Sequence, residues 1–311
     1  MTSEPKAIDT SVLQLVGNTP LMWIPYTACP NVKIFAKLEW YNPSGSVKDR
    51  AAAAIILDAL AKDKLKGKVL LDASSGNTGI AYAMMCASLG VPLELALPDN
   101  ASEERKLILK NYGVNLHYTS PLEGTDGAQK VAAHLANTHP DKYYYADQYN
   151  NPNNWNAHYM TTGPEIWSQT GEAITHFVTG LGTSGSFVGT SRFLKEKGVH
   201  CRAVHPDSPM HGLEGWKHME TALVPGIYDA TIADSNTEVG TEVAFQYAKA
   251  ATEYLGLMLS PSAAANLVAA IELAKEIESG TVVTLFPDNG MKYLRDSFWG
   301  DDTYKIENPF R

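Results

Sequence analysis

The chain has few cysteines, no long apolar run and no surplus of basic side chains, and each absence excludes a class of protein. Its three cysteines, Cys29, Cys86 and Cys201, are odd in number and far apart, which argues against a disulfide framework and a clustered metal site. No stretch reaches the roughly 18 apolar residues of a membrane-spanning helix, and residues 1–6 contain no apolar signal region. We therefore expect a protein of the reducing cytoplasm that binds no metal and enters no membrane.

The balance of charge argues against nucleic acid and anionic membranes as partners. The chain carries 25 basic and 34 acidic side chains, a net charge of −9, without a long run of lysine or arginine. Apolar side chains are abundant, since 44% of the 311 residues are hydrophobic, and the length predicts about two domains. A soluble globular protein is expected.

Short β-rich runs alternate with longer helical patterns along most of the chain. The predicted strands cover residues 69–72, 93–97, 114–118, 143–146, 176–179, 202–205 and 282–286. The predicted helices cover residues 49–62, 78–89, 102–112, 125–137, 186–197, 238–254 and 262–279. This alternation is typical of α/β layers with parallel sheets and crossover helices. A polar, turn-rich stretch at residues 147–154 indicates the junction between two domains.

One lysine stands between a tight turn and an apolar helix. Pro43 and Gly45 favour the turn, and Ser46 is expected at the N-cap of the helix. Lys48 would then be partly buried near the positive end of the helix dipole, and both effects disfavour its ammonium form, as a catalytic amine requires. Most lysines near helix starts are solvated surface groups, so this segment alone leaves both interpretations open.

Two glycine-rich turns each follow a predicted strand and precede a predicted helix. Residues 74–79 offer hydroxyls and amides at a helix N-terminus, which suits a small carboxylate, although small residues also form simple turns. Residues 180–186 contain three spaced glycines, as dinucleotide-binding loops do. A nicotinamide site would have an acidic residue at the end of the next strand, whereas Asp207 lies just beyond that strand. The loop would equally hold one cofactor phosphate, as pyridoxal 5'-phosphate requires.

Five motifs occur in an order that closely resembles the cysteine synthases of the type II pyridoxal-phosphate-dependent fold. They are residues 17–21, 42–50, 75–79, 161–167 and 180–185. The likeness extends from about Val16 to Leu294 and is greatest for the B-type branch of these O-acetylserine sulfhydrylases. It implies a two-domain, tryptophan synthase β-like α/β fold in which each domain is a mainly parallel sheet flanked by helices. The implied domains are residues 41–147 and, with a crossover of the amino-terminal segment, residues 1–40 and 148–311.

The same resemblance implies roles for individual residues. Lys48 corresponds to the catalytic Schiff-base lysine that carries pyridoxal 5'-phosphate, and Asn77 to the partner of the cofactor's ring hydroxyl. The implied phosphate site consists of Gly182, Thr183, Ser184, Gly185 and Ser186. The implied substrate-carboxylate site consists of Ser74, Ser75, Asn77, Thr78 and Gln148. Ser262 corresponds to the partner of the pyridine nitrogen, where a hydroxyl does not force protonation and so favours elimination at Cβ over transamination.

Several departures from the family pattern bear on these assignments. Ser74 stands where relatives usually have threonine, and His205 replaces a more usual acidic residue before proline. Residues 259–262 lack the usual glycines, which leaves the placement of the pyridine partner around Ser260 and Ser262 open. By its spacing from residues 224–226, Lys217 takes the place of an arginine that phosphoserine-using relatives present to the substrate phosphate.

The activity implied by the resemblance is β-replacement on an activated serine, with sulfide as the simplest nucleophile and L-cysteine as the product. We expect O-acetyl-L-serine as the preferred substrate and leave O-phospho-L-serine open. A homodimer is implied, and a serine acetyltransferase or a sulfur-carrier protein is left open as a further partner. Other enzymes of the fold remain alternatives, namely cystathionine β-synthase-like, cyanoalanine-forming and diaminopropionate-forming enzymes and serine or threonine dehydratases. Two further alternatives are a non-catalytic scaffolding paralogue and a nicotinamide-dependent oxidoreductase.

Overall fold

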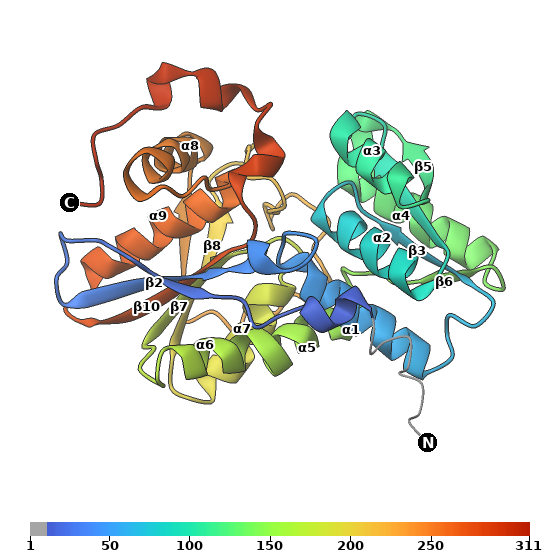
Figure 1. Ribbon diagram of the computed structural model, residues 1–311, viewed down its shortest axis with the longest axis horizontal. Helices are drawn as coiled ribbons and strands as arrows, with labels where there is room; N and C mark the ends of the chain where they lie inside the picture. The colour runs from blue at the N-terminus through green and yellow to red at the C-terminus, as the bar shows by residue number, and fades with distance from the viewer. Residues whose placement is uncertain (1–10) are drawn as a thin grey trace. The chain divides into compact units, whose positions relative to one another are not determined.

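The computed structural model describes residues 11–311, which form two compact units (Figure 1). The smaller unit comprises residues 11–17 and 42–154, and the larger comprises residues 18–41 and 155–311. The domain boundaries expected at 40/41 and 147/148 stay a prediction. In the structure residues 148–154 pack with the smaller unit, where the backbone N–H of Gln148 donates to the carboxylate of Asp72.

The smaller unit is built around a four-stranded parallel sheet in the order β5-β4-β3-β6. Its strands are β3 (Val69–Ala73), β4 (Leu93–Pro98), β5 (Asn115–Thr119) and β6 (Tyr143–Tyr145). Its helices are α1 (Lys48–Ala61), α2 (Asn77–Leu89), α3 (Glu103–Asn111) and α4 (Gly124–Thr138), and α5 (Pro152–Ala157) follows β6.

Alternation along β3 separates the two faces of this sheet. Leu70 packs in a core with apolar side chains of α1 and α2, whereas Leu71 and Ala73 pack against α4. Both faces are covered, which explains why the strands appear in the sequence as short, nearly continuous apolar runs. Asp72 shares the face of Leu70 and is fully buried there.

The larger unit contains a six-stranded sheet in the order β1-β2-β10-β7-β8-β9, in which only the β1–β2 pair is antiparallel. Its strands are β1 (Leu21–Ile24), β2 (Val32–Leu38), β7 (His176–Gly180), β8 (His200–Pro206), β9 (Ser235–Val239) and β10 (Gly280–Phe286). Its helices are α6 (Gly163–Gln169), α7 (Gly185–Lys195), α8 (Thr241–Ala250) and α9 (Pro261–Glu276). Across both units, the described residues also contain short 3-10 or π-helical turns. They lie at Val12–Leu15, Glu39–Tyr41, Pro121–Glu123, His158–Thr162, Ala251–Leu255, Gly290–Tyr293, Ser297–Gly300 and Asp302–Tyr304.

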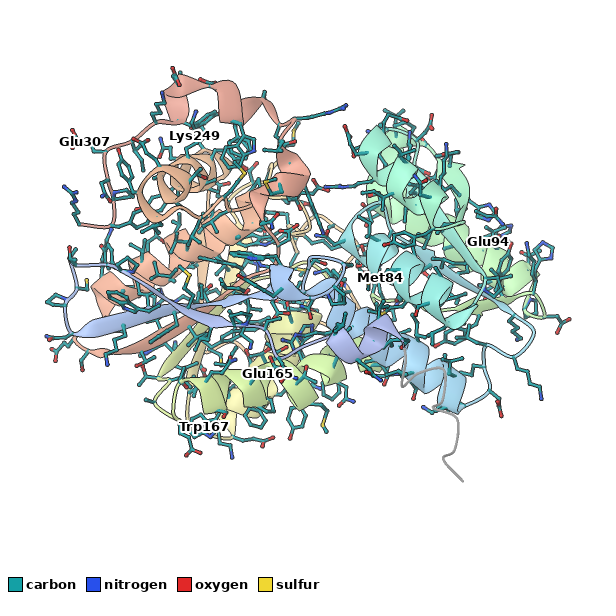
Figure 2. The ribbon with its side chains drawn as sticks, in the orientation of Figure 1. Met84, Glu94, Glu165, Trp167, Lys249 and Glu307 are labelled. Carbon is teal, nitrogen blue, oxygen red and sulfur yellow. The ribbon has the colours of Figure 1, made fainter. Side chains whose placement is uncertain are left out.

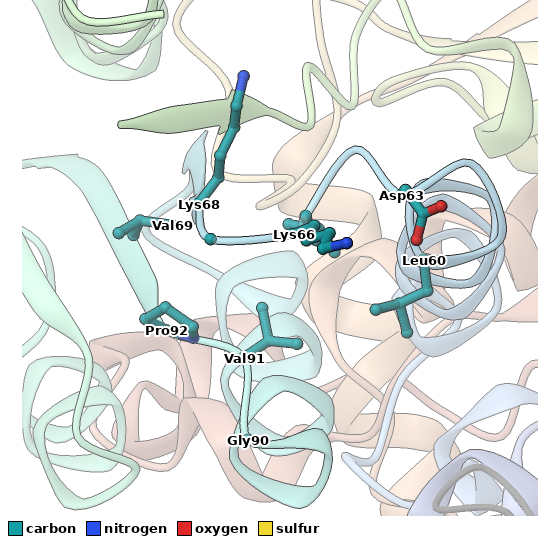
Figure 3. Close-up of a pocket in the computed structure, with 10 residues that line it drawn as sticks. Leu60, Asp63, Lys66, Lys68, Val69, Gly90, Val91 and Pro92 are labelled. Atoms are coloured by element: carbon teal, nitrogen blue, oxygen red, sulfur yellow. The ribbon is translucent and has the colours of Figure 1, made fainter. Parts of the chain in front are cut away.

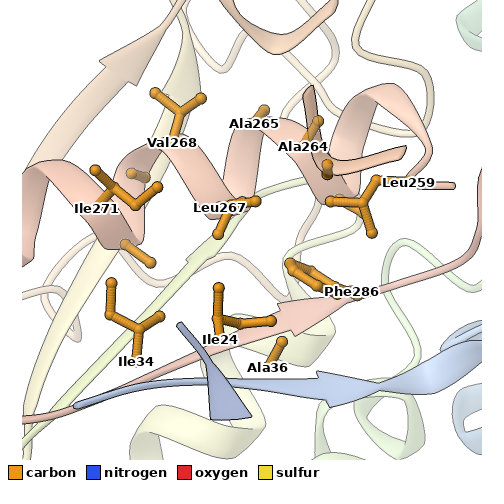
Figure 4. Close-up of a cluster of buried hydrophobic side chains, with 14 of the residues drawn as sticks. Ile24, Ile34, Ala36, Leu259, Ala264, Ala265, Leu267, Val268, Ile271 and Phe286 are labelled. Atoms are coloured by element: carbon orange, nitrogen blue, oxygen red, sulfur yellow. The ribbon is translucent and has the colours of Figure 1, made fainter. Parts of the chain in front are cut away.

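Helix α9 covers one face of the larger sheet, and Figure 4 shows its apolar side chains above the strands. Leu267 and Ile271 of α9 pack in one core with Ile24, Ile34 and Phe286 of the strands. The opposite face packs with α7, through the residues of β10 that alternate with Phe286. The predicted fold class, layered α/β with mainly parallel sheets, is confirmed.

The prediction of one helix over residues 238–254 is wrong in its first part. Glu238 and Val239 end strand β9, which pairs with β8 in parallel register, and α8 starts only at Thr241. Strands β1, β2 and β9 were not among the predicted strands. Helices α5 and α6 and the π-turn between them were not predicted either. These elements form where distant parts of the chain pair and pack, and such contacts leave little local pattern.

Candidate active site

The turn before Lys48 is held by its own side chains. Gly45 has a φ of 82°, which glycine adopts without strain, and its N–H donates to the Asn42 carbonyl at 2.8 Å. Asp49 is fully buried, and its Oδ2 accepts the Ser44 N–H at 2.7 Å while its Oδ1 pairs with the Ser44 hydroxyl. The lysine therefore stands at the first position of α1 behind a fixed turn.

Ser46 does not occupy the N-cap position that the sequence predicts. Val47 is the N-cap residue, in helical conformation and without a side-chain cap, so the helix starts at Lys48, one residue later than an N-cap at Ser46 implies. The Ser46 hydroxyl nevertheless accepts the backbone N–H of Lys48 at 3.3 Å. Ser46 thus satisfies one of the unpaired donors of the first turn, and Lys48 itself is half-buried.

The turn between β3 and α2 folds around the hydroxyl of Ser74. Its Oγ accepts the N–H of Gly79 at 2.9 Å and that of Gly76 at 3.3 Å. A Cβ at Gly79 would lie 3.2 Å from the Ser74 carbonyl oxygen, so glycine permits this close approach. Ser75 and Asn77, at the open end of the turn, are half-buried. The arrangement places backbone N–H groups and hydroxyls at the N-terminus of α2, as an anion site needs.

Gln148 joins this turn from the segment after β6. Its Nε2 donates to the Ala73 carbonyl at 2.9 Å, and its Oε1 accepts the Thr78 hydroxyl at 2.8 Å. Both Gln148 and Thr78 are buried. The structure therefore brings together Ser74, Thr78 and Gln148, three of the residues predicted for the substrate carboxylate.

The loop between β7 and α7 ends in a strained serine. Ser184 has a φ of 70°, makes no side-chain cap and is 1% exposed. Its Oγ is buried without a hydrogen-bond partner among residues 11–311. A buried hydroxyl left without a partner costs free energy, and at a helix N-terminus it is suited to bind an anion. Gly185 and Ser186 are the first two residues of α7.

A second loop, residues 212–217, packs closely on the loop of Ser184. A Cβ at Gly182 would collide with the Gly215 carbonyl oxygen, and a Cβ at Gly180 would collide with the Trp216 indole. The backbone N–H of Lys217 donates to the Leu181 carbonyl at 2.8 Å. These contacts explain why glycine occupies both positions of the predicted phosphate loop.

Asn266 of α9 fixes the beginning of the same loop, and sequence reasoning missed it. Its Oδ1 accepts the N–H of Gly180 at 2.8 Å, and its Nδ2 donates to the Leu285 carbonyl at 2.8 Å. It is 1% exposed. The available signal was a single asparagine in an otherwise apolar helix, since buried polar side chains are retained where they have partners.

Ser260 and Ser262 have different surroundings at the start of α9. Ser260 is the N-cap, and its Oγ accepts the Ala263 N–H at 3.2 Å. Ser262 is 4% exposed, and its Oγ lies 3.2 Å from that of Ser260. The capping bond engages Ser260, which favours Ser262 for the predicted pyridine contact.

Lys217, the residue predicted to meet a substrate phosphate, is half-buried, and its Nζ donates to the Leu223 carbonyl at 3.2 Å.

The predicted site residues thus fall into two groups, one in each unit. The smaller unit holds Lys48, Ser74, Ser75, Asn77, Thr78 and Gln148. The larger unit holds Gly182, Thr183, Ser184, Gly185, Ser186, Lys217 and Ser262. Within each unit the geometry suits an anion: a carboxylate at the first turn and a phosphate at the second. The turn of the smaller unit therefore fits the carboxylate of an amino acid, and the loop of the larger unit fits the phosphate of pyridoxal 5'-phosphate.

Two motifs without an implied role meet in a buried ion pair. Lys37 is fully buried, and its Nζ lies 2.7 Å from Oε2 of Glu165. Glu165, which Figure 2 labels on α6, also accepts the Asn18 N–H at 3.1 Å. The Lys37 ammonium donates to the Thr19 carbonyl at 2.5 Å as well. Asn18 and Thr19 of the first motif and Glu165 of the second therefore have a structural part in the larger unit.

A surface pocket of about 490 Å³ lies away from these turns (Figure 3). Val69, the first residue of β3, and Pro92, just before β4, line it, whereas Ser74 follows the last residue of β3. Lys66, Lys68 and Asp63 also border it. The pocket is therefore at the amino ends of the strands, opposite to the end where parallel α/β sheets bind ligands.

Other chemistries find little support in the part of the chain that the structure describes. Across residues 11–311, no group of three or more His, Cys, Asp or Glu is placed to hold a metal ion. None of the helices in that range combines the length and apolar character needed to cross a bilayer. Burial raises the pKa of the Cys86 thiol to about 12, which disfavours the nucleophilic thiolate.

Comparison with known proteins identifies the family. The family described as "Pyridoxal-phosphate dependent enzyme" matches residues 12–288. The chain is 49% identical to the cysteine synthase of Aquifex aeolicus (strain VF5) over 307 residues, which cover 95% of this chain and 94% of that protein. It is 38% identical to cysteine synthase B of Escherichia coli (strain K12), over 94% of this chain and 96% of that protein.

A solved structure shows the same fold. The crystal structure of cysteine synthase from Entamoeba histolytica superposes with a TM-score of 0.89 at 32% identity, and the match covers 99% of this chain and 94% of that chain. The resemblance inferred from the motifs is confirmed. The chain belongs to the family of pyridoxal-phosphate-dependent enzymes, and pyridoxal 5'-phosphate is its cofactor.

Proposed function

We propose that this enzyme forms L-cysteine by β-replacement on an activated L-serine, with sulfide as the nucleophile. O-acetyl-L-serine is the preferred substrate in this proposal, and O-phospho-L-serine is the second candidate. The observation that supports this proposal is a pair of strand-turn-helix sites. In one, hydrogen bonds fix Ser74, Thr78 and Gln148, and in the other the buried Ser184 hydroxyl has no partner among residues 11–311. The names of the similar proteins support the same activity.

Each group of residues has a defined part in the proposed reaction. Pyridoxal phosphate, when bound, accepts the electron pair left by removal of the Cα proton. Gly182, Thr183, Ser184, Gly185 and Ser186 would bind its phosphate, Asn77 its ring hydroxyl and Ser262 its pyridine nitrogen. Ser74, Ser75, Asn77, Thr78 and Gln148 would bind the substrate carboxylate.

Lys48 has two tasks in this proposal. Its amine would hold the cofactor, and, once freed by the substrate, it would remove the Cα proton. The acetate or phosphate leaves Cβ with the bonding electron pair, and sulfide adds at the same carbon. Lys48 finally returns a proton to Cα, so that protons and electrons balance.

The test compares the two substrates and one matched pair of variants. Purified enzyme is given pyridoxal 5'-phosphate, sulfide and either O-acetylserine or O-phosphoserine, and the amino-acid product is identified by mass spectrometry. We expect cysteine, formed faster from O-acetylserine. Lys48→Ala should abolish turnover, whereas Lys66→Ala, an exposed lysine after the same helix, should retain it.

Other products would overturn the proposal in specific ways. Cystathionine, cyanoalanine or diaminopropionate formed in preference to cysteine, with the corresponding nucleophile, would identify another replacement enzyme. Release of pyruvate from serine would identify a dehydratase. Cofactor binding without any turnover would identify a scaffolding paralogue.

The proposed setting is a homodimer in the cytoplasm. Cys29, Cys86 and Cys201 are free, in keeping with a reducing compartment. A serine acetyltransferase or a sulfur-carrier protein stays open as a partner. Light scattering on the purified enzyme checks the dimer, since a monomer at micromolar concentration would contradict it.

A further inference from the structure

Asp72 is a buried carboxyl that joins the ends of two neighbouring strands. It is fully buried, and its Oδ1 accepts the backbone N–H of Ala73 at 2.8 Å. Its Oδ2 accepts the backbone N–H of Gln148 at 3.3 Å, across a separation of 76 residues in the sequence. The two acceptor oxygens therefore hold the last residue of β3 and the segment after β6 in one arrangement.

The side chain of Gln148 closes a ring of hydrogen bonds over this carboxyl. It donates to the Ala73 carbonyl and accepts from Thr78, while the Gln148 carbonyl accepts the Nδ2 of Asn154 at 2.7 Å. The backbone N–H is thus the remaining polar group of Gln148, and Asp72 is its acceptor. Without Asp72, the N–H groups of Ala73 and Gln148 would lose these acceptors inside the protein.

Stability alone would favour a neutral acceptor over an ionisable carboxyl in this place. Across residues 11–311 no lysine, arginine or histidine forms an ion pair with Asp72. The titratable groups that face it are Tyr82 of α2, Tyr144, Tyr145, Tyr149 and Asp147. Burial raises the pKa of Asp72 to about 7, so ionisation is costly. Buried ionisable groups that are retained at such a cost concentrate at functional sites.

We infer that Asp72 is a positioning residue for the substrate carboxylate, acting by fixing Gln148 against the turn of residues 73–78. The inference deepens the proposed function and rests on it. Asp72 itself touches neither substrate nor cofactor in this scheme. Its carboxylate orients the backbone from which the binding groups project, as second-layer partners orient the groups of a preorganised site.

The principal test is Asp72→Asn, which keeps the shape but presents an amide N–H₂ to one of the two backbone donors. We expect KM for O-acetylserine to rise about tenfold and kcat to change less than threefold, because carboxylate binding is lost equally from ground and transition states. Gln148→Ala should raise KM in the same way. The double variant should be no worse than Gln148→Ala alone, because Asp72 acts through Gln148.

Matched controls separate positioning from general damage. Asp147→Asn removes a neighbouring carboxylate that bonds the Asn150 side chain instead, and it should leave KM within twofold. Cofactor content and far-UV circular dichroism of Asp72→Asn should match those of the wild type. Should Asp72→Asn fail to fold, Asp72→Ser replaces it in every measurement.

Failure of the inference and failure of the proposed function give different results. A folded, cofactor-loaded Asp72 variant with wild-type KM overturns the inference while cysteine formation stands. If the wild type makes no cysteine, the dissociation constant of L-serine, followed by the absorbance of the bound cofactor, replaces KM. A rise of about tenfold in Asp72→Asn would then support the positioning role, and an unchanged constant would overturn it.

Discussion

Ser184 shows how a single residue can have a conformation that folding alone does not explain. Its φ of 70° is unusual for a residue with a Cβ, and its hydroxyl has no partner within residues 11–311. Both features cost free energy in the free protein. A bound phosphate, as proposed for this loop, would supply the missing partner.

Ser184→Ala is expected to raise the dissociation constant of pyridoxal 5'-phosphate by at least about tenfold, because a hydrogen bond to a charged group contributes roughly 1.5–3 kcal/mol. Alanine keeps the same Cβ, so backbone strain is unchanged. Titration of the apoprotein, followed by cofactor absorbance, measures the effect. Thr190→Val is the control, since Thr190 is another buried, unpartnered hydroxyl further along α7. Equal affinities for wild type and Ser184→Ala would exclude the serine from the phosphate site.

Lys217 is the residue whose substitution tests the choice between the two substrates. Lys217→Ala should lower kcat/KM for O-phosphoserine about tenfold, as expected for a lost contact of about 1.4 kcal/mol, and spare O-acetylserine. A lysine serves a dianion as a point charge without the bidentate geometry of arginine. Steady-state kinetics with both substrates provide the internal comparison. An equal response of the two substrates, or none, would remove Lys217 from the site.

At the scale of elements, the buried pair of Lys37 and Glu165 joins β2 to α6. Lys37 is fully buried and the Glu165 side chain is 15% exposed. Burying two charges is costly, and the pair is tolerated because each partner also has backbone hydrogen bonds. The pair therefore fixes the position of α6 against β2, while its net contribution to stability is small.

Glu165→Gln should lower the free energy of unfolding by roughly 3–5 kcal/mol, because it leaves the Lys37 charge buried without its counter-charge. Urea unfolding, followed by circular dichroism, measures this loss. Asp302→Asn is the control, since Asp302 pairs with Lys305 on the surface, where solvent screens the pair, and the substitution should cost far less than Glu165→Gln. A loss below 1 kcal/mol for Glu165→Gln would mean that the buried Lys37 charge does not depend on the Glu165 carboxylate.

At the scale of the whole molecule, Asp72 links stability to pH. Burial raises its pKa from 3.8 to about 7, so the folded protein keeps a proton on Asp72 at pH values where the unfolded chain has lost it. The contribution of Asp72 to stability is therefore greatest below about pH 4 and declines as the pH rises towards 7.

Asp72→Asn should remove this decline. Since a tenfold change in an ionisation constant corresponds to about 1.4 kcal/mol, the variant should gain up to about 4 kcal/mol relative to the wild type between pH 4 and pH 8. Urea unfolding of both apoproteins across that range gives the difference between their free energies of unfolding, in which the contributions of the other titrating groups cancel. A constant difference between them would mean that Asp72 has an ordinary pKa in the folded protein.

The sequence by itself determined the local elements and the chemistry they carry. The turn before Lys48 and the turns at residues 74–79 and 180–186 were recognisable because glycines, hydroxyls and flanking apolar runs are local in the sequence. Most helices and strands start within a few residues of their predicted positions for the same reason.

Only the tertiary structure decided what depends on distant contacts. Strand β9 forms because it pairs with β8, although part of it resembles the start of a helix. Asn266 reaches Gly180 across 86 residues, and Asp72 reaches Gln148 across 76. A buried hydrogen bond is defined by the geometry of both partners, and neither partner's neighbours in sequence encode where the other lies.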